Sequence, residues 1–225
     1  MKVDAVIKLG GGLLRKKTVL RSICNELNWL KDQGYKIVIV PGGGELSDCV
    51  RRIYEEYKSS EEKAHWMAIR AMDINGMLVS ELNNKFTCVT SISDCIKKLQ
   101  NGLIPIFLSY NLLRKHDILP KSWDVTSDSI SLYIAQLIKA KFHILLKDVN
   151  GVYINLKNKK LINRIHVTEL RTLRRNSCVD KYLPTLLLRF GKYTHVISGL
   201  HPARIERVLT GQECRGTIIT TKGKA

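Results

Sequence analysis

The stretch A-V-I-K-L-G-G-G-L-L, residues Ala5–Leu14, sets the pattern for this 225-residue chain. Its first half is apolar apart from Lys8, as in a buried strand, and it ends in Gly10, Gly11 and Gly12. Apolar residues at spacings of three and four follow, which is typical of an amphipathic helix. A strand, a glycine turn and a helix in this order can bind an anion, because glycine lets backbone N–H groups approach it closely. The same order can also be a tight turn beside a lysine whose ammonium reaches solvent.

A near repeat of this stretch favours the anion-binding interpretation. The apolar run Lys36–Val40 leads into Pro41 and three more glycines, Gly42, Gly43 and Gly44, before another helical pattern. If both runs are parallel strands of one sheet, their glycine turns lie at the same edge, where open α/β sheets bind their ligands. Two adjacent turns predict a site for a long phosphate chain or for two phosphorylated ligands.

Neither glycine turn matches a common nucleotide-binding motif. Gly10–Arg15 and Gly42–Ser47 both lack the last glycine of the dinucleotide fingerprint. The lysines that follow Gly10 are not preceded by the glycine that a Walker P-loop requires. Both of these interpretations are therefore disfavoured.

Length and composition limit the class of protein. The chain is long enough for one large α/β domain or two small lobes, and no apolar run approaches the roughly 18 residues of a membrane helix. The first residues lead directly into a strand, so we expect no signal peptide. The six cysteines contain no C-x-x-C pair and the six histidines contain no H-E-x-x-H motif. We therefore expect a cytoplasmic protein without disulfides, structural zinc or another metal held by side chains.

The formal net charge of +17 makes nucleic-acid binding an obvious hypothesis. The basic residues are nevertheless spread along the chain, and the densest part, 157–175, lacks the interleaved aromatic residues that single-strand binders use. Its basic residues are Lys157, Lys159, Lys160, Arg164, Arg171, Arg174 and Arg175. A solvated basic surface that attracts small polyanions explains the charge more simply, so we expect no specific nucleic-acid partner.

The stretch Glu61–Leu82 follows two serines that can cap a helix, and it is apolar on almost every side of that helix. Such a helix is buried either in the core or against a second copy of the chain. We favour partial burial in a dimer interface, and hence a homo-oligomer. Trp66 is expected in the core, whereas Asp73 is a candidate for a ligand pocket.

Residues 123–129, W-D-V-T-S-D-S, place five polar residues ahead of an apolar helix. Asp, Thr and Ser favour helix starts, so these residues can simply cap the helix. A cap needs only one or two of them, however. An acid such as Asp128, close to phosphate-binding turns, can also orient lysines or a magnesium ion.

Strand and helix patterns alternate along the whole chain. Further strands are expected at 86–89, 104–108, 142–146, 161–165, 195–198 and 216–220. Helices are expected at 13–33, 45–57, 94–100, 202–209 and from 178 onwards. The alternation predicts an α/β fold, a three-layer αβα sandwich with a largely parallel central sheet. Residues 1–225 then form a single domain, whose lobes, about 1–120 and about 121–225, meet at a hinge loop, 110–119.

Several segments together resemble the amino acid kinase family. They are K-L-G-G-G near the start, P-G-G-G after the second strand, T-S-D-S before the apolar helix, L-L-K-D-V-N-G-V-Y, C-V-D-K-Y-L-P and the final G-T-I-I-T. These segments cover nearly the whole chain in the right order. The resemblance implies an eight-stranded αβα sandwich that uses ATP and magnesium and transfers the γ-phosphoryl group to a carboxylate, carbamate or phosphate. The lobe 1–120 would then bind the acceptor, and the lobe 121–225 the nucleotide.

The resemblance also implies roles for individual residues. Lys8 would bridge the phosphoryl groups, Lys181 would contact the nucleotide phosphates, and Asp128 would hold both lysines in place. The phosphates would lie against the backbone of Gly10, Gly11, Gly12, Gly42, Gly43 and Gly44. The residues expected beside the nucleotide are Lys147, Asp148, Gly151, Val152 and Tyr153, and those expected beside the acceptor are Asp73, Asp124 and Ser127. Lys147 is a departure, since the family usually has Thr or Ser there; a lysine can add a phosphate contact or face solvent.

Four further segments are similar to the branch of this family that acts in methanofuran biosynthesis. They are V-P-G-G-G-E-L-S-D, A-H-W-M-A-I-R-A-M-D, P-K-S-W-D-V-T-S-D-S-I-S and S-G-L-H-P-A-R-I-E-R-V-L. This resemblance implies a phosphotransferase whose acceptor is a phosphate group, and which converts (5-(aminomethyl)furan-3-yl)methyl phosphate to the diphosphate. The ammonium of that ester needs an anionic or carbonyl partner, for which Asp73 and Asp124 are candidates.

The absence of an evident catalytic base in either glycine turn agrees with a phosphate acceptor, which is already anionic at neutral pH. Three alternatives stay open at this point. The chain can be a uridylate kinase, whose acceptor is also a phosphate monoester, or another member of the family. It can also be a relative that binds an anion without turning over ATP.

Overall fold

The computed structural model describes residues 2–116, 118–154, 160–173 and 178–222. Of the basic stretch 157–175, Lys157, Lys159, Arg174 and Arg175 lie outside the described residues. The strands within them are β1 Ala5–Leu9, β2 Ile37–Pro41, β3 Phe86–Val89, β4 Ile104–Phe107, β5 Phe142–Lys147, β6 Arg164–His166, β7 Thr194–Ser198 and β8 Gly216–Thr220. The helices are α1 Gly11–Leu14, α2 Lys17–Asp32, α3 Gly44–Tyr57, α4 Glu61–Ser80, α5 Ile92–Gln100, α6 Ser109–Lys115, α7 Ser127–Leu137, α8 Val167–Thr172, α9 Leu183–Phe190 and α10 Arg204–Thr210.

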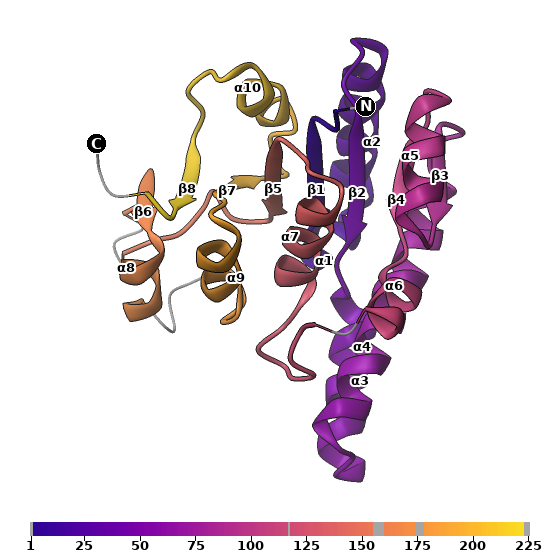
Figure 1. The fold of residues 1–225 in the computed structure, drawn as a ribbon, viewed down its shortest axis with the longest axis vertical. Helices are drawn as coiled ribbons and strands as arrows, with labels where there is room; N and C mark the ends of the chain where they lie inside the picture. Colours follow the sequence, from indigo (N-terminus) through magenta and orange to yellow (C-terminus); the bar gives the residue numbers. More distant parts are fainter. Residues whose placement is uncertain (1, 117, 155–159, 174–177, 223–225) are drawn as a thin grey trace.

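The strands form one sheet in the order β3-β4-β2-β1-β5-β7-β8-β6, which runs from right to left in Figure 1. Neighbouring strands are parallel except β7 and β8, which are antiparallel. The predicted α/β fold with a largely parallel sheet is therefore confirmed. Because β1 lies between β2 and β5, the turns that follow β1 and β2 meet at one edge of the sheet. The division into an acceptor lobe and a nucleotide lobe stays a prediction.

Two hydrophobic clusters form the core, and β1 shows how the sheet divides them. Val6 belongs to the cluster that includes α7 and α9, whereas Ala5, Ile7 and Leu9 belong to the cluster that includes α2 and α10. Side chains of a strand alternate between its two faces. Lys8 therefore lies on the face that α7 covers, although its position in the strand is buried.

The helices α3 and α4 lie side by side and extend beyond the carboxyl end of β2 (Figure 1). Both begin near the positions expected from the sequence, and the cap of α4 is Ser60, whose hydroxyl accepts the N–H of Lys63 at 3.3 Å. Trp66 packs in the core, as predicted. Among the described residues, no helix combines the length and the apolar character that crossing a membrane requires.

The prediction of a hinge loop at 110–119 is wrong, because most of this segment belongs to the helix α6. The carboxylate of Asp73, on α4, accepts the backbone N–H groups of Ser109 and Tyr110 at 2.7 and 3.4 Å. These N–H groups belong to the first turn of α6, where no partner within the helix exists. The cap comes from a residue 36 positions earlier, which local sequence patterns do not reveal.

Other helices differ from the predictions in their limits. The single helix expected at 13–33 is divided into α1 and α2, because Lys16 has a non-helical ψ of 82°. The helix expected from Cys178 onwards starts only at Leu183, with Pro184 in its first turn. The short helix α8 was not predicted at all. Residues 178–182 consequently form an irregular connection before α9, which matters for the site.

Candidate active site

Both glycine turns lie at the carboxyl ends of their strands and pack against each other through their backbones. A Cβ atom added to Gly11 would overlap the backbone of Gly44, and one added to Gly42 would lie 2.8 Å from the nitrogen of Gly11. Gly44 also has a φ of +52°, a conformation that residues with a side chain rarely adopt. Glycine is therefore needed here to bring the two turns together, whatever ligand they bind.

Asn75 on α4 holds the second glycine turn in place. Its side-chain amide donates to the carbonyl oxygens of Gly42 and Gly43 at 2.8 and 2.7 Å. The side chain is buried, so both bonds are protected from water. Sequence reasoning missed Asn75, although an amide in the middle of an almost wholly apolar helix was a signal that could have been noticed.

Lys8, Asp128 and Lys147 meet beside the glycine turns. The ammonium nitrogen of Lys8 lies 2.9 Å from one carboxylate oxygen of Asp128. The ammonium of Lys147 donates to both oxygens of the same carboxylate, at 2.8 and 2.7 Å. Lys8 lies opposite Leu145 in the parallel pair β1–β5, so Lys147, two positions further on, is on the same face of the sheet. Both lysines consequently reach the first turn of α7, which carries Asp128.

The cluster of Lys8, Asp128 and Lys147 is buried and carries more positive than negative charge. Burial lowers the pKa of Lys8 to about 8, although Asp128 opposes the shift. Burial also disfavours the ionised form of Asp128, but Lys147 and Lys8 outweigh it and hold the pKa of the carboxyl below its ordinary range. For Lys147 burial is outweighed by Asp128, which raises its pKa. Two ammonium groups that share one carboxylate leave an excess of positive charge, which suits an anionic ligand.

The expectation that Asp128 holds Lys181 is wrong, since Lys147 takes that place. The ammonium of Lys181 donates instead to Asp124 at 2.7 Å, and these two side chains are 80% and 52% exposed. Lys181 precedes α9, in the irregular connection 178–182, and its neighbour Asp180 is partly buried. Lys181 and Asp124 therefore form a surface ion pair, and Asp124 does not fit its expected place beside the acceptor.

Asp180 ties the connection 178–182 to the start of α7. Its carboxylate accepts the backbone N–H and the hydroxyl of Thr126, both at 2.9 Å, and the corresponding groups of Ser129 at 2.9 and 2.6 Å. The N–H of Asp180 in turn donates to Asp128 at 3.2 Å. Thr126 also caps α7, so the polar residues at 123–129 serve as a cap, as anchors for Asp180 and as the partner of two lysines. Sequence reasoning missed Asp180.

Asp73 does not line the cavity described below, so its expected acceptor-binding role does not fit this structure. Its two oxygens are already used to cap α6. Burial raises the pKa of Asp73 to about 6, while the N–H groups of Ser109 and Tyr110 oppose that shift. A buried carboxylate needs such donors, and here they come from the backbone rather than from a ligand.

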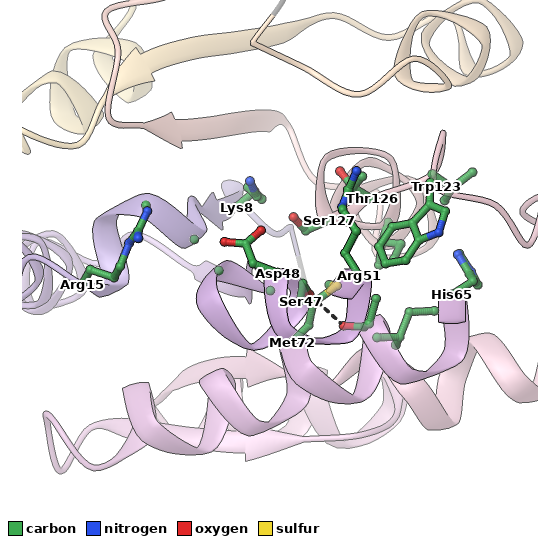
Figure 2. Close-up of a pocket in the computed structure, with 18 residues that line it drawn as sticks. Lys8, Arg15, Ser47, Asp48, Arg51, His65, Met72, Trp123, Thr126 and Ser127 are labelled. Carbon is green, nitrogen blue, oxygen red and sulfur yellow. Dashed lines mark hydrogen bonds between the residues drawn. The ribbon is translucent and has the colours of Figure 1, made fainter. Parts of the chain in front are cut away.

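A cavity of about 260 Å³ opens between the glycine turns, α3, α4 and the segment before α7 (Figure 2). Its inner end is formed by Lys8 and the backbone of Gly11, Gly12, Gly43 and Gly44. Its apolar wall consists of Ala68, Ile69, Met72, Val125 and Ile130. Ser127 is the one of the three predicted acceptor residues that lines it.

The other charged and aromatic residues that line this cavity, called its rim here, are Arg15, Asp48, Arg51, His65 and Trp123. The guanidinium of Arg51 lies 4.5 Å from the centre of the Trp123 ring, and Arg15 approaches Glu45 at 3.4 Å. In Figure 2, Asp48 lies beside Lys8 and Arg15 lies to the left of both, whereas Arg51, Trp123 and His65 lie to the right. None of the rim residues was singled out from the sequence.

The segment expected beside the nucleotide follows β5. The carboxylate of Asp148 lies against Gly12, where a Cβ atom would come within 2.8 Å of it. Gly151 has a positive φ, and the N–H of Val152 donates to the hydroxyl of Thr217 at 2.8 Å. The side chain of Val152 is fully buried in the core, so only its backbone is available to a nucleotide. Tyr153 pairs with residue 161 in an isolated bridge and is partly exposed.

Comparisons with known proteins identify the family. Residues 5–188 match the amino acid kinase family. The chain belongs to the amino acid kinase family. It is 33% identical over 208 residues to the [5-(aminomethyl)furan-3-yl]methyl phosphate kinase of Methanocaldococcus jannaschii, which covers 92% of this chain and 93% of that protein. It is 25% identical over 237 residues to the uridylate kinase of Methanococcus vannielii, covering 96% and 99% of the two chains.

A solved structure shares the fold of this chain. The structure of UMP kinase from Bacillus anthracis matches with a TM-score of 0.75 and 20% sequence identity, over 98% of this chain and 96% of that chain. The predicted family and the predicted fold are both confirmed.

Lys147 is the clearest departure of this amino acid kinase from the expected pattern, in which Thr or Ser was expected at its position. Of the two alternatives considered for the lysine, exposure to solvent is wrong, because its side chain is only 13% exposed and is bound to Asp128. The catalytic, phosphate-binding and nucleotide-binding roles of the residues described above stay predictions.

Proposed function

We propose that this protein is an ATP-dependent kinase that transfers the γ-phosphoryl group to a small phosphate monoester and forms a diphosphate. The observation that carries the proposal is the buried, net positive cluster of Lys8, Asp128 and Lys147 at the shared edge of two glycine turns. The relative from Methanocaldococcus jannaschii supports a phosphate acceptor, and its name supports [5-(aminomethyl)furan-3-yl]methyl phosphate in particular.

The cluster suits phosphoryl transfer, a reaction that requires alignment and neutralisation of charge more than covalent work by the protein. In this proposal the ammonium groups of Lys8 and Lys147 contact oxygens of the phosphate that is transferred. Backbone N–H groups of the glycine turns contact the neighbouring phosphates. Both kinds of donor are fixed before the substrates arrive, as electrostatic stabilisation of a transition state requires.

Asp128 acts in this proposal as a positioning residue and not as a base. Both its oxygens already accept hydrogen bonds from Lys147, and its pKa is held below the ordinary range of a carboxyl. It therefore has little tendency to take a proton. A phosphate monoester needs no such base, because its attacking oxygen is already ionised near neutral pH.

The residues of the site are suited to binding the phosphates of ATP, and they are not suited to holding a magnesium ion with side chains. Within the residues that the structure describes, no group of three His, Cys, Asp or Glu side chains is placed to hold a metal. Asp128, the acid considered for that role, is engaged by two lysines. The magnesium that accompanies ATP would then be bound mainly by phosphate oxygens and water, which is its usual habit. The chain itself supplies the lysines and the N–H groups.

Phosphorus NMR of a mixture of ATP, the aminomethylfuran ester and the protein tests the proposed function. We expect new diphosphate signals and the formation of ADP. UMP and isopentenyl phosphate, added as competitors, should be phosphorylated more slowly. A preference for UMP would overturn the acceptor but not the kinase activity. ATP binding without any product would instead support the non-catalytic alternative.

A homo-oligomer is the second part of the proposal, supported by apolar residues on the outside of α4. Ile74, Met77 and Leu78 are 55%, 58% and 53% exposed, although they lie beside buried residues of the same helix. We expect α4 to pack against another copy of the chain, since such a surface would otherwise face water. The predicted cytoplasmic location stays a prediction.

Analytical sedimentation measures the oligomeric state directly. The protein should sediment as a dimer or a multiple of one, and Met77→Glu should shift it toward the monomer, whereas the exposed substitution Lys85→Glu outside α4 should not. A wild-type monomer at micromolar concentration would contradict the interface.

A further inference from the structure

Asp48 is the carboxylate at the rim of the cavity. Within the part of the chain that the structure describes, no other Asp or Glu lines this cavity. The side chain is exposed, and Figure 2 shows it extending from α3 into the cavity, on the side of Lys8. The other acids considered for the acceptor, Asp73 and Asp124, cap α6 and pair with Lys181.

The positive charges of the rim are engaged elsewhere. Arg15 approaches Glu45 at 3.4 Å, and the guanidinium of Arg51 lies over the ring of Trp123. No ion pair or side-chain hydrogen bond joins Asp48 to another described residue. The cavity therefore contains one carboxylate that has no partner of its own.

The position of Asp48 on α3 fixes its separation from the glycine turns. It lies four residues after Gly44, the first residue of α3, so it is about one helical turn, roughly 6 Å, further along the helix axis. The same cavity has an apolar wall that includes Ile69, Met72 and Val125. An anion-binding end, an apolar wall and a single carboxylate therefore line one cavity within a short distance of each other (Figure 2).

This combination of groups complements a molecule of one chemical class. Its phosphate would lie at the glycine turns and Lys8, a small uncharged ring would lie against the apolar wall, and a cationic group would lie at Asp48. An acceptor whose second end is anionic would instead be repelled by this carboxylate.

We propose that Asp48 is a specificity-determining residue, which binds the ammonium group of a phosphate ester that carries a primary amine. The proposal rests on the proposed kinase function and adds the residue that selects the acceptor. Selection follows from a hydrogen-bonded ion pair that only the amine can make, while the phosphoryl transfer itself depends on Lys8 and Lys147.

The experiment compares two acceptors and three proteins. The acceptors are [5-(aminomethyl)furan-3-yl]methyl phosphate and the ester in which a hydroxymethyl group replaces the aminomethyl group. The proteins are the wild type, Asp48→Asn, and Glu55→Gln as a control. Glu55 is exposed on the same helix and does not line the cavity, so this control makes the same change of charge outside the proposed site.

We expect the wild type to prefer the amine ester, and Asp48→Asn to lower kcat/KM for that ester by about 10- to 100-fold, the usual range for losing a hydrogen bond to a charged group. The loss should lie mainly in KM. The hydroxymethyl ester should be used equally well by the variant and the wild type, and that activity also shows that the variant is folded. Glu55→Gln should behave as the wild type with both esters.

Two results would overturn the role of Asp48. One is an Asp48→Asn variant that keeps the wild-type preference for the amine. The other is an equal loss of activity with both esters, which would mean that the carboxylate acts on the transfer itself. A wild type that phosphorylates neither ester would instead refute the proposed function, and the role of Asp48 with it.

Discussion

The two ends of the cavity are built in different ways. At the inner end, Lys8 and Lys147 come from neighbouring strands of the central sheet, and their ammonium groups are fixed by a buried carboxylate. At the rim, Asp48, Arg51 and Trp123 come from a helix and from the segment before α7, and Asp48 is exposed. In the proposed function the inner end is the site that binds phosphates. The rim residues do not belong to the strands of the sheet, so substitutions there should not disturb it.

This contrast indicates a division of labour. In the proposed function, any acceptor presents a phosphate to the inner end, and the transfer takes place there. What distinguishes one phosphate ester from another is the remainder of the molecule, which meets the rim. Substitutions at the inner end should therefore change turnover with every acceptor, and substitutions at the rim should change the choice between acceptors.

The largest effect is expected for Lys8→Ala. We expect turnover to fall by about 10²- to 10⁴-fold with every acceptor, since a cation aimed at the transferred phosphate is lost. The fold should survive, because Asp128 keeps Lys147 as its partner. Steady-state kinetics measures the turnover, and a thermal melt shows whether the variant is folded. Near-normal turnover in a folded variant would show that Lys8 does not take part in phosphoryl transfer.

Lys147→Met should have the next largest effect. The substitution keeps much of the side chain's volume but removes one of the two ammonium groups on Asp128, and we expect turnover to fall by about 10- to 10³-fold. The ratio of kcat/KM between two acceptors should stay constant, unlike the result expected for Asp48→Asn. If turnover is unaffected, Lys147 only neutralises Asp128 and has no contact with phosphate.

Sequence reasoning recovered the inner end better than the rim. The glycine turns and Lys8 follow directly from strand patterns, because the end of a strand and its turn are local features. Asp128 was found for the same reason, at the start of a helix. Its second partner was misassigned to Lys181, because the choice between that lysine and Lys147 depends on the register of β1 against β5, which no local pattern contains.

The rim and the supports of the site could not be predicted for a related reason. Asp73 was expected to bind a ligand, but it caps α6, which begins 36 residues later where a loop was expected. In the sequence, Asp48 is an ordinary polar residue of an amphipathic helix. Only the structure shows that α3 lies beside the cavity. Such roles depend on which elements meet in space, and that information appears only with the tertiary structure.

The pH dependence of ATP binding is a smaller effect that tests the burial of Lys8. Burial lowers the pKa of Lys8 to about 8, so in the free protein its ammonium loses its proton as the pH rises above that value. The phosphates of ATP are already ionised there. We expect the dissociation constant for ATP to rise above pH 8, by up to about tenfold per pH unit. Calorimetry in two buffers should show proton uptake on binding, and Lys8→Met should lack both effects.

The same shift has a consequence for stability, with a definite sign. Between pH 8 and the ordinary lysine value of 10.5, the unfolded chain keeps a proton that the folded chain has lost at Lys8. The contribution of Lys8 to the free energy of unfolding should therefore rise with pH across this window. Denaturant titrations of wild type and Lys8→Met would show this as a difference that changes with pH, and a constant difference would contradict the shifted pKa.

The smallest effect is expected for Lys181→Met, and it separates the structure from the pattern first inferred from the sequence. Lys181 pairs with Asp124 on the surface, where exposed ion pairs contribute about 0–1 kcal/mol to stability. We expect turnover to change by less than about threefold, the scale of such a weak surface interaction. The matched substitution Lys147→Met makes the same chemical change in the buried cluster, so the two variants differ only in the location of the lost charge. A loss with Lys181→Met as large as that with Lys147→Met would show that the connection before α9 moves when ATP binds, and that Lys181 joins the phosphates after all.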